Sequence, residues 1–116
     1  MKKMFMAVFA ALFFTAPVMA QNITAEITNL TNGIYYTPLL LATHPASTHL
    51  FQSGIAASVN LQAMAEGGNI AGLITDLQGV SANIVDNPAA GLLAPGMSTT
   101  GTFSKDGKNT HLSIVA

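Results

Sequence analysis

The first twenty residues differ in composition from the rest of the chain, and they restrict folding to the segment that follows. Two lysines precede an unbroken apolar run of eleven residues, Met4 to Phe14, and a short break containing a proline leads to a small residue, Ala20. This order is typical of a secretory signal peptide. We therefore expect residues 1–20 to be cleaved off between Ala20 and Gln21. Residues 21–116 are then left for one small domain.

The alternative interpretation of the apolar run is a membrane anchor. A helix needs roughly 20 apolar residues to cross a bilayer, and eleven are too few. The short n-region with two lysines looks bacterial, and the absence of a cysteine after Ala20 disfavours a lipid-anchored lipoprotein. We expect a bacterial protein that is secreted or periplasmic, without a transmembrane anchor in its mature form.

The composition of residues 21–116 excludes several classes of function. This segment contains two lysines, Lys105 and Lys108, and five acidic residues, and the chain contains no arginine. Contacts with phosphate need a basic surface, so we expect neither nucleic-acid binding nor polybasic docking to an anionic membrane. Because the chain has no cysteine, it has no disulfide, no thiolate nucleophile and no cysteine-based zinc site.

Strand patterns dominate both ends of the mature chain. Residues 23–29 alternate, with Ile23, Ala25 and Ile27 on one face, which predicts a half-buried strand. Further strands are expected over 34–42, 80–85, 97–104 and 110–116, with a loop over 43–47. Pro38 cannot donate to a ladder, so it predicts an edge strand or a bulge. Because Asp106-Gly107 is a strong turn signal, segments 97–104 and 110–116 are expected to form a hairpin.

The middle of the chain carries two helical patterns. Apolar residues recur at helical spacing from Ala57 to Ala65, and Gly67-Gly68 follows as a C-terminal stop. Asn69 is placed to cap a second helix that ends near Gly79. Helices this short are not stable alone, so each must pack on a sheet.

These elements predict an all-β fold, an antiparallel β-sandwich with two short helical inserts. The segment 110–116 stops in the middle of a strand pattern, on an apolar run. Unpaired strand edges invite aggregation. We therefore expect the chain to be the front part of a longer domain, so that the sandwich is incomplete.

An ordered set of short segments resembles the spondin N-terminal domain. These segments are Asn29-Leu30-Thr31 with Gly33, Tyr36-Thr37-Pro38, Ala42-Thr43-His44, Phe51, Gly54, Ala57-Ser58, Leu61, Ala65-Glu66-Gly67-Gly68-Asn69, Leu93, Pro95-Gly96 and Thr110-His111-Leu112-Ser113. The resemblance covers residues 23–116, nearly all of the mature chain. It implies that residues 21–116 are the N-terminal part of a spondin-like β-sandwich domain.

The resemblance also implies a role. Spondin-type domains act in adhesion and binding in the extracellular matrix or at cell surfaces, which here implies an unknown protein or glycan surface ligand. The family continues beyond the Thr-His-Leu-Ser strand with further strands, some of them acidic, which this chain lacks. Calcium is therefore implied only for a complete domain, and no cofactor is expected for this chain.

Three histidines are the candidate metal ligands. His44 and His49 flank one loop, and His111 lies on a strand that is able to approach it, so the three are a candidate site for zinc or copper. The alternative is that His44 bonds to backbone in a turn before Pro45 and that His111 is a half-buried strand residue. The sequence has no Gly-x-Ser-x-Gly motif and no paired carboxylates, so we expect no catalytic residues and no enzyme.

Two functions remain after these exclusions. The first is a secreted, non-enzymatic binding or adhesion module of the spondin type. The alternative is a periplasmic metal-binding protein that uses His44, His49 and His111.

Overall fold

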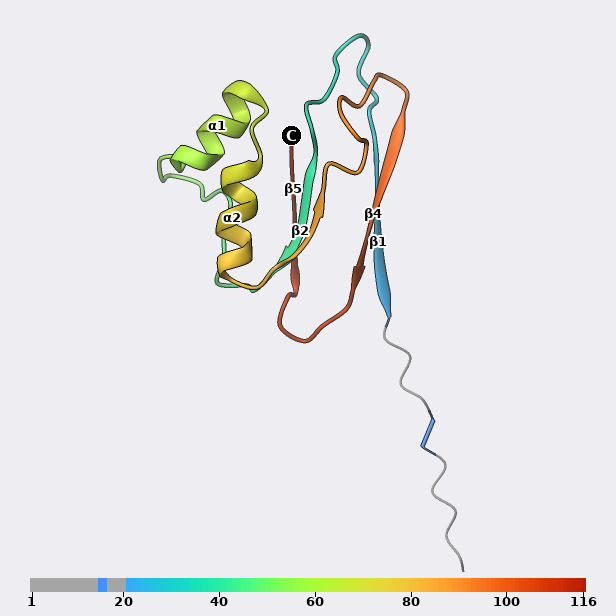
Figure 1. Ribbon diagram of the computed structural model, residues 1–116, viewed down its shortest axis with the longest axis vertical. Helices are drawn as coiled ribbons and strands as arrows, with labels where there is room; N and C mark the ends of the chain where they lie inside the picture. Colours follow the sequence, from blue (N-terminus) through green and yellow to red (C-terminus); the bar gives the residue numbers. More distant parts are fainter. Residues whose placement is uncertain (1–14, 17–20) are drawn as a thin grey trace, which may run out of the picture.

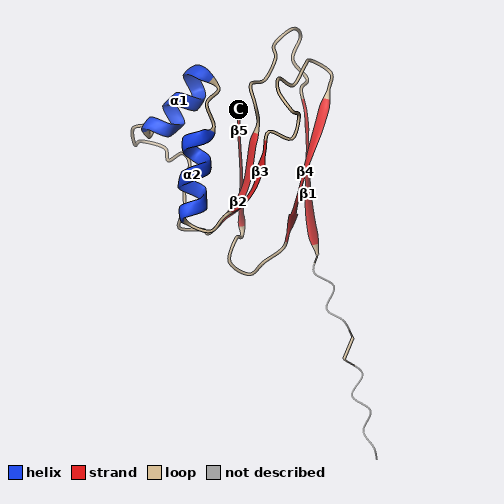
Figure 2. Ribbon diagram, in the orientation of Figure 1, coloured by secondary structure: helices blue, strands red, loops and turns tan. Residues whose placement is uncertain are grey.

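The computed structural model describes residues 15–16 and 21–116. Residues 1–14 and 17–20, with most of the expected signal peptide and Ala20, lie outside the described residues. The elements follow in the order β1 (Asn22–Thr28), β2 (Leu40–His44), α1 (Val59–Gly67), α2 (Ala71–Gly79), β3 (Asn83–Asp86), β4 (Ser98–Ser104) and β5 (His111–Val115). They form two antiparallel sheets and a pair of short helices, a small β-sandwich-like fold (Figures 1 and 2).

Strand β2 is the centre of the larger sheet, whose order is β3-β2-β5. Every residue of β2 is buried, as expected for a strand covered on both faces. Of the two expectations for the strand that contains Pro38, an edge strand or a bulge, the edge strand was therefore wrong, and the strand expected over 34–42 begins only at Leu40. Pro38 lies two residues before the ladder begins, so its missing N–H costs no strand hydrogen bond. The expected loop over 43–47 was also partly wrong, because Thr43 and His44 continue the strand.

The two helices lie where the sequence predicts them, with their first residues shifted by one or two positions. Ser58 caps α1 by accepting a hydrogen bond from the backbone N–H of Leu61 at 3.1 Å. Gly68 ends α1 in the left-handed conformation, at a φ of 66°, which glycine adopts without strain. The Asn69 side chain accepts from the N–H of Ala71 at 3.1 Å, at the start of α2. Both predicted helices are thus confirmed.

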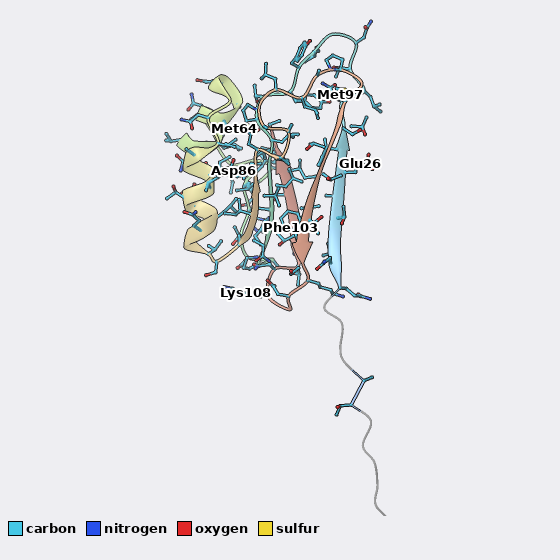
Figure 3. The ribbon with its side chains drawn as sticks, turned by 45° about the vertical axis from the view of Figure 1, so that its right-hand side comes forward. Glu26, Met64, Asp86, Met97, Phe103 and Lys108 are labelled. Carbon is cyan, nitrogen blue, oxygen red and sulfur yellow. The ribbon has the colours of Figure 1, made fainter. Side chains whose placement is uncertain are left out.

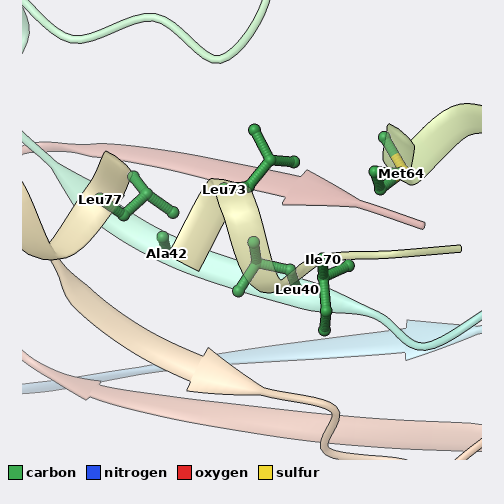
Figure 4. Close-up of a cluster of buried hydrophobic side chains, with 6 residues drawn as sticks. All are labelled: Leu40, Ala42, Met64, Ile70, Leu73 and Leu77. Atoms are coloured by element: carbon green, nitrogen blue, oxygen red, sulfur yellow. The ribbon is translucent and has the colours of Figure 1, made fainter. Parts of the chain in front are cut away.

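The helices cover one face of the larger sheet. Leu40 and Ala42 of β2 point toward the helices (Figure 4). They pack with Met64 of α1, with Ile70 directly before α2 and with two leucines of α2. The buried members of this cluster are Leu40, Ala42, Met64, Ile70, Leu73 and Leu77. The helices therefore form an outer layer of their own, which stabilises the sheet through a continuous apolar core.

The second sheet, β1 paired with β4, covers the opposite face of β2. Leu39 and Leu41 belong there to one buried cluster with Phe103 of β4. Figure 3 labels Phe103 on its strand. A Cβ atom on Gly101 of β4 would lie 2.9 Å from Cδ2 of Leu41, so the two sheets approach too closely there for a larger residue. The molecule thus has three layers: helices, a three-stranded sheet and a two-stranded sheet (Figure 1).

The expected hairpin between β4 and β5 was wrong. Strand β4 pairs with β1, whereas β5 pairs with β2, so residues 105–110 carry the chain from one sheet to the other. The physical reason lies in Asp106, whose side chain binds across to the larger sheet. Its Oδ2 accepts a hydrogen bond from Nδ2 of Asn83 on β3 at 2.8 Å, and Asn109 donates from its side chain to the carbonyl oxygen of Ser81 at 3.1 Å.

The hydrogen bonds to Asp106 also stabilise its charged form. The backbone N–H of Asn109, the Asn83 amide, the Asn109 amide and the backbone N–H of Lys108 all donate to it. They lower the pKa of Asp106 from about 3.8 to about 2, against the opposing effect of partial desolvation. A carboxyl group whose pKa is lowered by folding stabilises the native state wherever it is ionised.

We predict that Asp106 makes folding sensitive to acid between about pH 4 and pH 2. The contribution of Asp106 to the free energy of unfolding is complete above the pKa of its carboxyl group in the unfolded chain. This contribution is lost as the pH falls toward the lower pKa of the folded protein. The substitution Asp106→Asn should lower the free energy of unfolding at neutral pH and flatten its decline in that acid range. Denaturant melts at a series of pH values measure both effects. An unchanged decline in the variant would show that other groups cause it.

Candidate binding pocket and histidine pair

The connection from β2 to α1, residues 45–58, forms one wall of a pocket against the two helices. The pocket has a volume of about 240 Å³. It is lined by Thr48, His49, Leu50, Phe51, Gln52, Ile55, Ala56, Ala57, Ser58, Leu61, Leu73, Asp76 and Leu77. Local hydrogen bonds shape the connection: the N–H of Thr48 donates to the Pro45 carbonyl at 3.0 Å, and that of Ile55 donates to the Gln52 carbonyl at 3.3 Å.

Large apolar side chains at this pocket remain open to solvent. Phe51 is 69% exposed and Ile55 is 60% exposed, although both lie beside the buried Leu73 and Leu77. A single exposed apolar residue is ordinary, but two on one loop beside a pocket suit an apolar contact with a ligand. The pocket therefore has an apolar floor and an apolar rim.

Polar groups occupy the remaining pocket wall. His49 is exposed on the loop, and Asp76 projects from α2. Oδ2 of Asp76 accepts a hydrogen bond from Nδ2 of Asn60 on α1 at 2.7 Å, which links the two helices. Pockets for drug-sized ligands span about 300–1,000 Å³. A space of about 240 Å³ therefore suits a side chain or a single sugar ring, held by apolar contact and a few hydrogen bonds.

His44 is buried at the end of β2 and has both ring nitrogens engaged. Its Nδ1 lies 3.0 Å from the Pro45 carbonyl oxygen, and its Nε2 lies 2.7 Å from Oγ of Ser113 on β5. The expected backbone contact before Pro45 is thus confirmed. Because a metal ligand needs a free nitrogen lone pair, binding through His44 requires one of these contacts to break.

The structure brings two of the three candidate histidines together. His111 pairs with His44 across β2 and β5, and their rings stack with centroids 6.3 Å apart. His111 is exposed and not half-buried as expected. His49 lies apart from this pair, since residues 15–16 and 21–116 contain no group of three or more His, Cys, Asp or Glu side chains placed to hold a metal ion. The three-histidine site stays a prediction.

Of the expected export signal, residues 1–20, the structure describes only residues 15–16, and it resumes at Gln21, directly after the expected cleavage site. Gln21 is exposed and directly precedes β1, whereas Ala20 lies outside the described residues. Within the part of the chain that the structure describes, no helix is both long and apolar enough to cross a membrane.

Sequence reasoning missed the pocket. Phe51 entered through the spondin resemblance and as one of the few aromatic residues available to a sugar-binding surface, and Ile55 was not considered. The available signal was an apolar residue on either side of Gly54 in a segment without helical or strand periodicity. Such residues lack the core-facing pattern of a helix or strand, so the sequence places them on a loop and does not show what they contact.

Comparisons of the chain with protein-family models, with curated proteins and with solved structures give no match. The resemblance to the spondin N-terminal domain stays a prediction from the residues quoted for it.

We predict that Ser113→Ala destabilises the protein by about 1–3 kcal/mol, because it leaves Nε2 of the buried His44 without its hydrogen-bond partner. The matched control is Ser104→Ala, which removes an exposed hydroxyl at the end of β4 and should cost less than about 0.5 kcal/mol. Urea melts of both variants measure the difference. If the two variants have the same free energy of unfolding, water replaces the Ser113 hydroxyl at His44 without a loss of stability.

Proposed function

We propose that this chain is an exported, non-enzymatic binding module of the spondin type that attaches to a protein or glycan on a surface. The observation that carries this proposal is the open pocket with its exposed apolar rim, Phe51 and Ile55. The ordered residues of the spondin resemblance support the same role. An extracellular or periplasmic site of action follows from the expected signal peptide.

The arrangement of the pocket suits attachment. Its floor is part of the main core, through Leu73 and Leu77, so the binding wall is held by the same contacts that hold the helices on the sheet. A preorganised wall loses little conformational entropy when a ligand binds. His49, Gln52 and Asp76 supply hydrogen-bonding groups that select the orientation of a partner side chain or sugar.

We predict that the mature protein binds saturably to cell-envelope material from which detergent has removed the lipid. Phe51→Ser should weaken this binding by about tenfold or more, because the lost apolar contact is worth about 1.5–3 kcal/mol when it is buried. Fluorescence anisotropy of the labelled protein measures the affinity. Pretreating the material with protease or with periodate distinguishes a protein ligand from a glycan.

The matched control for this experiment is Val59→Ser. Val59 is an exposed apolar residue at the start of α1 and does not line the pocket. Its substitution should leave the affinity unchanged. If binding is absent, or if both substitutions weaken it equally, the pocket is not the attachment site and the proposed function fails.

The alternative function, a periplasmic metal-binding protein, has one observation in its favour, the stacked pair of His44 and His111. A site with three ligands requires the loop that carries His49 to move toward this pair. It also requires His44 to exchange its contact with Ser113 for the metal. Zinc and copper are the ions that suit imidazole ligands.

If the alternative is right, zinc or copper should raise the melting temperature, because a ligand that binds only the folded state stabilises it. His49→Ala should abolish that rise. Thermal melts with each metal and with a chelator test this, and calcium is included because the spondin resemblance implies it for a complete domain. No shift with zinc or copper would exclude the histidine site, whereas a shift with calcium alone would point to a different site.

A further inference from the structure

Strand β5 is an edge of the larger sheet, and its outer side is open. The sheet order is β3-β2-β5, so β5 has β2 on one side and, among the residues that the structure describes, no strand on the other (Figure 2). An open edge presents a row of N–H and C=O groups at strand spacing, which another strand matches. The kind of partner that this edge fits is therefore an extended polypeptide.

The alternation of backbone groups along β2 identifies the open groups of β5. The N–H of Asn87 donates to the carbonyl oxygen of Leu39 at 2.9 Å, so Leu39 bonds toward β3. Successive residues of a strand bond to opposite sides, so the next residue and every second one after it bond toward β5. These pairs are Leu40 with Val115, Ala42 with Ser113 and His44 with His111. Leu112 and Ile114 therefore direct their N–H and C=O groups away from the sheet.

The side chains of the same two residues are apolar and half open to solvent. Leu112 is 44% exposed and Ile114 is 43% exposed. Ile114 pairs with Leu41, which belongs to the core between the two sheets, so Ile114 and Leu112 point to that side of the sheet. Neither belongs to the core itself. A strand paired with β5 would cover both the open backbone groups and these two side chains.

The other strand edges differ from β5. Strand β1 carries Glu26 and β3 carries Asp86, and charged residues are one means by which proteins keep an edge unpaired. The large apolar residue of β4, Phe103, is already buried. Strand β5 contains no charged residue and no proline, and its two apolar side chains are open. It thus has the composition of a strand that is paired on both sides.

The open edge of β5 is complementary to itself. When a second copy is related to the first by a two-fold axis at Ser113, each Leu112 lies opposite Ile114 of the other copy, and the two exchange N–H···O=C bonds. The apolar side chains then lie on one face of the joined sheet. Ser113 meets its own copy at the narrow position between these pairs, which suits a small side chain. No charge opposes this pairing, because β5 carries none.

We infer that two copies of this chain join edge to edge through β5, antiparallel about Ser113, so that their larger sheets become one sheet of order β3-β2-β5-β5-β2-β3. The two-fold axis closes the assembly at two copies, because each copy uses its only β5. The contact involves five residues of each strand, so the interface is small and the dimer is weak. No residue of β5 lines the pocket, so the inference is independent of the proposed function.

Sedimentation equilibrium of the exported protein, with its mass determined, tests the dimer. We expect the average mass to rise toward twice that of one chain between about 1 μM and 1 mM. Hydrogen exchange then locates the contact. The amides of Leu112 and Ile114 should exchange about tenfold more slowly once about nine in ten copies are dimeric. The amide of Ser113 bonds to β2 and should exchange slowly at every concentration.

An exchange of charges tests the register. One variant carries Leu112→Lys with Ile114→Lys, and a second carries Leu112→Glu with Ile114→Glu. Each variant alone should remain monomeric, because like charges face each other across the edge, whereas an equal mixture should form the dimer again. Both side chains are half exposed, so the folded monomer accommodates the charges, and circular dichroism checks this. Loss of folding cannot produce recovery on mixing.

The matched control is Leu30→Lys with Leu92→Lys, which adds the same charges at exposed leucines outside β5 and should leave association unchanged. A protein that stays monomeric throughout overturns the inference, as does association that the β5 lysine substitutions leave intact. Failure of the mixture to associate also overturns it. Amides of Leu112 and Ile114 that are protected even at the lowest concentration would show that another segment occupies the edge, which overturns it as well. None of these outcomes bears on the binding of envelope material at the pocket.

Discussion

Burial of β2 on both faces is the constraint on which the rest of the structure depends. Leu40 and Ala42 belong to the core beneath the helices, whereas Leu39 and Leu41 belong to the core between the sheets. One short strand therefore serves as the shared wall of two apolar clusters. Loss of packing on either face is transmitted to the other through that strand, because interiors packed this closely have little free space to absorb a change.

The same strand connects the core to both candidate sites. His44, its last residue, bonds to Ser113 on β5 and stacks on His111, and the loop that follows leads directly to the pocket. The pocket floor is formed by residues of α2 that also pack against β2. Both candidate sites are thus positioned by regular structure, and only their outer walls are formed by loops.

Local features of the fold were predictable from the sequence, but its long-range pairing was not. Gly68 ends α1 where the Gly67-Gly68 pair predicts, and Asn69 bonds to the first residue of α2 as expected of a residue at a helix start, because such contacts depend only on near neighbours. The partner of β4, by contrast, depends on the contacts of the connection that follows it. Asp106-Gly107 has the composition of a hairpin turn, but the Asp106 side chain bonds to Asn83, and this contact cannot be deduced from spacing.

In the candidate sites, too, local contacts were predictable from the sequence and long-range contacts were not. The backbone contact of His44 was predictable because it involves the next residue, Pro45. The pocket was not, since Phe51 and Ile55 meet α2 only after the helices have packed. Irregular loops lack the periodicity from which burial is read, so their role emerges only from tertiary structure.

The order of strand pairing also has a consequence for synthesis. Among the residues that the structure describes, strand β1 pairs with β4 alone, and the contact between Thr24 and Thr102 joins residues 78 positions apart. The ladder between β2 and β5 joins similarly distant segments. Since such pairings must wait for their distant partners, neither sheet can close while the chain is still emerging from the ribosome. The two helices and the ladder between β2 and β3 need only residues up to Asp86, so the side of the fold that the helices cover can form before the sheet of β1 and β4.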